Sequence, residues 1–166
     1  MIGTDGDARS SSGLWIVLFL AVGVFSAGLL VYFFDRTQPP WFVERLGGRF
    51  SSDNSRVLGQ FSSFAPSFAH NFAFCIFTAL SGELTVKRIN YSCIMWMVLN
   101  LLLEFSQIRS VSTVISHFFE TTLGGVIDRL KPFSQFHKGT FDWADIASIL
   151  VSTIMARILL KGFVGK

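Results

Sequence analysis

The amino-acid sequence predicts an all-α membrane protein with four transmembrane helices in a compact bundle. Hydrophobic residues make up 51% of the 166 residues and charged residues 15%, a balance that is unusual for a soluble domain. Four stretches reach or approach the roughly 20 residues that span a bilayer core. We therefore expect a polar tail over residues 1–13 and one membrane domain over residues 14–166, with helices over residues 14–34, 64–80, 91–107 and 143–160.

The first apolar stretch is the clearest of the four, because residues 14–34 contain no charge. It is longer than the apolar part of a usual signal peptide. The residues before it carry Asp5 and Asp7 against Arg9, which is not the basic start that a signal peptide has. We therefore expect this helix to remain uncleaved.

The connections between the other stretches differ in length. The short polar connection Ser81–Asn90 predicts that the second and third helices are antiparallel neighbours. Pro66 is tolerated in a first helical turn and also occurs in loops, so the start of the second helix stays open. The connection Ile108–Thr140 is longer than an ordinary loop and carries apolar residues, which indicates a segment that lies on the membrane interface or re-enters it.

A polar stripe follows one face of the third predicted helix. Asn100, Glu104 and Gln107 are spaced i, i+4, i+7, so a helix places them on one face of an otherwise apolar surface. A carboxylate at the membrane centre costs about 2.5–3.5 kcal/mol on insertion scales. We therefore expect Glu104 to face protein or water, with Asn100 and Gln107 as its supporting hydrogen-bonding groups.

Several polar residues fall at the same membrane face in a bundle of four spans. This candidate cluster comprises His70, Glu104, Gln107, Arg109, Asp142 and Asp145. The basic residues are nearly balanced between the two faces, so the positive-inside rule does not orient the chain. They are also scattered rather than gathered into a stripe, which favours lipid headgroups over nucleic acid as their partner.

Each of these residues also has a structural interpretation. Asp142 is a good helix N-cap, and Asp145 would lie in the first turn, where the helix dipole favours a negative charge. His70 could act as a base or proton relay, or be a hydrogen-bonded interfacial residue. A metal site formed by His70, Glu104 and Asp145 is chemically admissible, but nothing in their spacing demands one, so no metal and no cofactor is predicted.

Small residues predict where helices pack closely. Ser148, Ser152 and Ala156 form a ridge on the fourth predicted helix that lets two backbones approach. Cys75 and Cys93 fall inside or at the edge of the second and third spans, where a thiol usually packs as a small apolar group.

Three short motifs resemble the VanZ-like family of membrane proteins, named for a teicoplanin-resistance accessory protein. They are His70 before an aromatic-rich second span, Glu104-x-x-Gln107 at the end of the third, and Gly139-Thr-Phe-Asp-x-x-Asp145 at the start of the fourth. Members usually carry Asn and Gly four and seven residues after the last aspartate, where this chain has Ile149 and Ser152. The resemblance implies a bacterial cytoplasmic membrane protein with a cytoplasmic amino terminus and an outward-facing polar cleft.

Three functions are compatible with these observations, and whether the chain is an enzyme stays open. The first is a VanZ-like accessory protein of the cell envelope that presents the polar cleft to a lipid-linked or glycan-related ligand. The second is an interfacial lipid-phosphate hydrolase, because Pro66-Ser-Phe-Ala-His70 and Arg109 with His117 faintly resemble motifs of type 2 phosphatidic acid phosphatases at altered spacing. The third is a structural subunit or chaperone of another membrane protein.

Overall fold

The protein is all-α over the residues that its computed structural model describes, which are 5–34, 61–108, 111, 113, 114, 121 and 141–164. Four long helices run through them: α1 (Asp5–Phe34), α3 (Phe61–Leu80), α4 (Val86–Ser106) and α6 (Trp143–Lys161). The predicted connection Ile108–Thr140 lies almost entirely outside the described residues, and so do Arg109 and His117.

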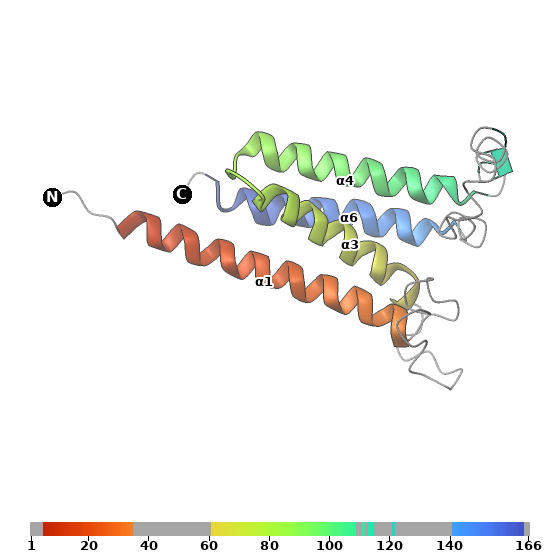
Figure 1. Cartoon of the computed structure of the whole chain (residues 1–166), viewed down its shortest axis with the longest axis horizontal. Helices are drawn as coiled ribbons and strands as arrows, with labels where there is room; N and C mark the ends of the chain where they lie inside the picture. The colour runs from red at the N-terminus through yellow and green to blue at the C-terminus, as the bar shows by residue number, and fades with distance from the viewer. Residues whose placement is uncertain are drawn as a thin grey trace.

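The four helices lie side by side with alternating directions (Figure 1). Helix α3 contacts each of the other three, and α4 also contacts α6. The antiparallel pairing predicted for α3 and α4 is confirmed. At one end of the bundle, α1 and α4 finish and α3 and α6 begin. We call this the acidic end, and we call the opposite end the basic end, because of the charged residues that each carries.

Helices α1, α4 and α6 are long and apolar enough to cross a membrane. Their outward surfaces support that role, because large apolar side chains such as Phe19, Leu102 and Ile158 are exposed along them. An apolar surface of this extent would be a liability in water and is satisfied in hydrocarbon. The fourth predicted span, α3, is not among these candidates and holds Pro66, His70 and Asn71 in its apolar sequence, so its crossing stays a prediction.

Three of the helices begin earlier than the apolar pattern predicts. Helix α1 begins at Asp5, inside the expected polar tail, because no proline interrupts residues 5–13 and each added residue gains one backbone hydrogen bond. Helix α3 begins at Phe61 and holds Pro66 in its second turn. Helix α4 begins at Val86, where the side chain of Thr85 accepts a hydrogen bond of 3.2 Å from the Arg88 backbone N–H. The connection between α3 and α4 is therefore only Ser81–Thr85.

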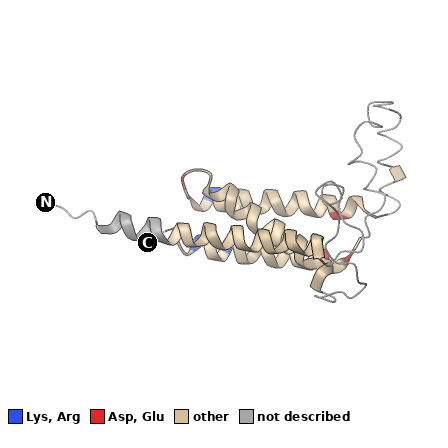
Figure 2. Cartoon of the chain, turned by 60° about the horizontal axis from the view of Figure 1, so that its bottom comes forward, with Lys and Arg blue, Asp and Glu red and all other residues tan. Residues whose placement is uncertain are grey.

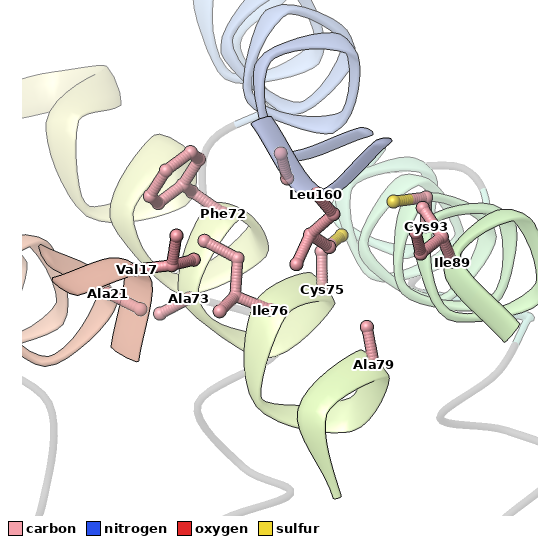
Figure 3. Close-up of a cluster of buried hydrophobic side chains, with 11 residues drawn as sticks. Val17, Ala21, Phe72, Ala73, Cys75, Ile76, Ala79, Ile89, Cys93 and Leu160 are labelled. Carbon is pink, nitrogen blue, oxygen red and sulfur yellow. The ribbon is translucent and has the colours of Figure 1, made fainter. Parts of the chain in front are cut away.

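The apolar core lies toward the basic end and is centred on α3 (Figure 3). Small side chains, including Ala73, Ala79 and Ala156, are fully buried and let the helices approach closely. Cys75 of α3 and Cys93 of α4 are both buried, and their thiols point toward one another (Figure 3). The prediction that both cysteines pack as small buried groups is confirmed.

Close packing also defines the contacts that α3 makes with α6 and α1. The predicted ridge of Ser148, Ser152 and Ala156 is buried in the bundle, as expected. On the other side of α3, a Cβ atom added at Gly28 of α1 would lie only 2.5 Å from the Cβ of Ala69. The crossing of α1 over α3 therefore depends on the absence of a side chain at Gly28.

Candidate functional site

The polar stripe on α4 faces into the bundle. Glu104 is only 9% exposed, while its neighbours Leu103 and Phe105 point outward. The amide Nδ2 of Asn100 donates to Asn71 Oδ1 on α3 at 3.0 Å, and Gln107 Nε2 donates to Glu104 Oε1 at 3.4 Å. The expectation that Glu104 faces protein and not hydrocarbon is therefore met.

The start of α6 supplies the second carboxylate of the acidic end. Asp142 is the N-cap of α6, and its Oδ1 accepts a hydrogen bond of 2.9 Å from the Ala144 backbone N–H. Asp145 lies in the first helical turn and is 5% exposed. The rings of Phe105 and Phe141 stack at 6.0 Å, which holds the end of α4 beside the start of α6. Glu104 and Asp145 are thus both buried at the same end of the bundle.

The capping role of Asp142 gives a first testable prediction. Asp142→Ala is expected to lower the free energy of unfolding by about 0.5–2 kcal/mol, because the α6 backbone loses its side-chain acceptor. Asp142→Asn is expected to restore most of that loss, because asparagine caps about as well as aspartate. Unfolding of the purified protein in detergent micelles measures both. An asparagine variant as unstable as the alanine variant would show that the charge of Asp142, and not its capping bond, is what stabilises α6.

Asn71 is the centre of the polar contacts inside the bundle. Its side chain is fully buried, and its Nδ2 lies 2.8 Å from both Ser152 Oγ and Thr153 Oγ1 and 3.0 Å from the Ile149 carbonyl oxygen. Together with the bond from Asn100, these contacts join α3, α4 and α6 at one point. The hydroxyls of Ser152 and Thr153 in turn donate to the Ile149 carbonyl oxygen.

Polar side chains follow the contact between α3, α4 and α6 toward the acidic end. We call them the polar column, which comprises Asn71, Asn100, Ser152, Thr153, Glu104 and Asp145. Asn71 and Asn100 mark its inner part, and Glu104 and Asp145 lie one helical turn farther out, four residues from Asn100 and Ile149. Its inner part is made of amides and hydroxyls that are hydrogen bonded to one another, whereas its outer part carries two carboxyl groups. The outer part can accept hydrogen bonds from the hydroxyl or ammonium groups of a ligand, and Gln107 can supply an amide there.

Figure 2 shows how the charged residues divide along the bundle. Within the described helices, Lys and Arg lie toward the end where α4 begins and α6 finishes. Glu104, Asp142 and Asp145 belong to the opposite end. The basic end also holds acidic residues, namely Glu83 in the turn between α3 and α4 and Asp5 and Asp7 at the start of α1.

His70 is placed apart from the polar column. Its ring packs edge-on against Phe25 of α1, with a centroid distance of 5.2 Å, and lies parallel to Phe74 at 6.1 Å. Phe74 in turn stacks on Trp96 of α4 at 4.6 Å. His70 therefore belongs to an aromatic row that connects α1, α3 and α4, and its predicted role as base or relay is untested. Among the described residues, no three His, Cys, Asp or Glu side chains come together as a metal site would require.

The sequence analysis did not single out Asn71, which is the most connected polar residue of the described bundle. The sequence nevertheless indicated that Asn71 is important, because an asparagine within a predicted membrane span must find a hydrogen-bonding partner. The partners of Asn71 are 78 to 82 residues distant in the chain, so no local spacing pointed to them.

No protein-family model, curated protein or solved structure matches this chain.

Proposed function

We propose that the protein is a VanZ-like integral membrane protein of the bacterial envelope. In this proposal, the acidic end binds a lipid-linked or glycan-related ligand at the outer face of the cytoplasmic membrane, and the amino terminus is cytoplasmic. The protein acts as an accessory factor and not through a reaction of its own. All four helices, including α3, cross the membrane.

The observation that carries the proposal is the burial of two carboxylates, Glu104 and Asp145, at one end of a bundle with a lipid-facing surface. Ionisable side chains are costly to bury in a membrane protein and are commonly found at functional sites, which supports a ligand site at these two residues. The same two residues belong to the motifs that resemble the VanZ-like family.

The chemistry of the site also suits a glycan or a lipid headgroup. Sugar hydroxyls are donors that carboxylates accept, and the Gln107 amide can donate to ligand oxygens. The inner part of the polar column is closed by hydrogen bonds among its own members, so a ligand would engage only the outer residues. That arrangement fits a headgroup that approaches from the membrane surface.

Loss of activity in Glu104→Gln tests the proposal. In a teicoplanin-susceptible Gram-positive host, expression of the unmodified protein is expected to raise the minimum inhibitory concentration of teicoplanin. Glu104→Gln and Asp145→Asn are expected to return it to the value of the empty vector, because each keeps the side-chain shape and removes the charge. Glu83→Gln, at the opposite end, is the matched control and is expected to behave as the unmodified protein.

Two outcomes would contradict different parts of the proposal. An unmodified protein that leaves susceptibility unchanged would overturn the VanZ-like function. An unmodified protein that protects, together with a fully active Glu104→Gln at equal membrane abundance, would overturn the assignment of the site to Glu104.

A further inference from the structure

The contact between α4 and α6 at the basic end carries a group of cations. Arg157 Nε of α6 donates to Asn90 Oδ1 of α4 at 2.9 Å. Lys161 follows Arg157 by one helical turn, and Lys87 precedes Asn90 by about one turn, so all three cations lie along the same seam. Both lysines are exposed. We call Lys87, Arg157 and Lys161 the seam cations.

Among the residues whose side chains the structure describes, no carboxylate forms an ion pair with the seam cations. Glu83, the one acid at this end whose side chain is described, is exposed in the turn between α3 and α4. Arg88 is engaged elsewhere, because its guanidinium donates to the Thr78 carbonyl oxygen at 3.3 Å and to Ser81 Oγ at 2.7 Å. The seam therefore concentrates positive charge that the described residues do not neutralise.

An apolar surface continues from the seam cations toward the middle of the bundle. Ile158, between Arg157 and Lys161 in the chain, is 68% exposed. Ile94 on α4 and Ile154 on α6, each 57% exposed, lie about one turn from Asn90 and Arg157 toward the middle of the bundle. Tyr91 is exposed beside them, as is common for tyrosine where membrane and water meet. A molecule that lies along the seam would meet cations first and hydrocarbon-compatible side chains next.

We propose that the α4 and α6 seam at the basic end binds an anionic phospholipid. The phosphate of the lipid lies against Lys87, Arg157 and Lys161, and an acyl chain follows Ile94, Ile154 and Ile158. The bond from Asn90 orients the Arg157 guanidinium and leaves its terminal nitrogens available to the phosphate. This site lies at the opposite end from the acidic residues and does not depend on the function proposed for them.

The test uses the full-length protein purified in a neutral detergent and delipidated. Dioleoylphosphatidylglycerol, dioleoylphosphatidylcholine and inorganic phosphate are titrated separately, and native mass spectrometry counts bound lipid while thermal unfolding reports stabilisation. Phosphatidylglycerol is expected to bind and raise the melting temperature, and the other two are not. In the Lys87→Gln/Lys161→Gln double variant, affinity is expected to fall about five-fold for each lysine removed.

Folding of the double variant is checked by its melting temperature without lipid, which is expected to equal that of the unmodified protein because both lysines are exposed. Glu83→Gln serves as a matched charge-changing control and is expected to bind phosphatidylglycerol at least as well. Equal binding of the two lipids, or unchanged affinity in the double variant, would overturn the site. Stabilisation by inorganic phosphate equal to that by phosphatidylglycerol would overturn the acyl-chain part of the proposal.

Discussion

Replacing Asn71 by alanine is expected to lower the free energy of unfolding by about 2–4 kcal/mol. Polar contacts between membrane helices are worth about 0.6 kcal/mol on average and about 1.7 kcal/mol at most. Asn71 makes such contacts with Ser152 and Thr153 of α6 and with Asn100 of α4. The alanine variant also leaves an internal void and removes the acceptor of the Asn100 amide, and both add to the loss.

Asn90→Ala is the matched control for Asn71→Ala. It is the same substitution on a described helix of the bundle, and it removes one bond, to Arg157, at an exposed position. We expect it to cost less than about 1 kcal/mol. Reversible unfolding in mixed micelles, followed by circular dichroism, measures both variants. An equal loss of unfolding free energy in the two variants would show that the buried polar contacts are not what holds α3, α4 and α6 together.

Replacing Gly28 by leucine is expected to weaken or abolish the packing of α1 on α3. Even a methyl group at Gly28 would approach the Ala69 Cβ to 2.5 Å, and the Pro66 Cα lies 3.7 Å from the same point. Overpacking of this kind costs about 1–3 kcal/mol, because the backbone must move to relieve it. The effect should be a loss of stability confined to the α1 contact.

The chain offers a control for Gly28 on the same helix. No atom lies within 4 Å of a Cβ built at Gly23, so Gly23→Leu is expected to be neutral or slightly stabilising. Protection of α1 from proteolysis, together with the unfolding midpoint, compares the two variants. If Gly23→Leu destabilised the protein as much as Gly28→Leu, close approach of α1 and α3 could not be the reason for the glycine.

The lengths of the apolar stretches in the sequence predicted the four long helices of the described chain and the boundaries of α6. They placed the starts of α1, α3 and α4 too late in the sequence. Val86, Lys87 and Arg88 were assigned to a polar connection, although they form the first turn of α4. Hydropathy indicates which part of a helix is surrounded by lipid. The helix itself extends beyond that part for as long as its backbone hydrogen bonds are satisfied. The N-cap residue Thr85 marks the start of α4.

The position of Glu104 was predictable because its stripe depends only on spacing along one helix. Four-residue spacing placed Asn100 and Glu104 on one face, and both face the bundle interior. The role of Asn71 and the separation of His70 from the polar column depend on how α3 is rotated against α1 and α6. That rotation follows from close packing at positions such as Gly28 and Ala69, which no local pattern in the sequence specifies.

The hydrogen bond between Asn71 and Asn100 has a consequence for how the chain enters the bilayer during synthesis. Helix α3 carries a buried asparagine that would be costly to expose to hydrocarbon, and α4 follows it after a turn of only Ser81–Thr85. If the two helices enter together as a hairpin, each amide shields the other before α6 has been made. Ser152 and Thr153 then arrive to complete the contacts. If α3 crosses the membrane as proposed, the order of helices in the chain allows it to be inserted together with α4, which supplies a partner for its buried asparagine.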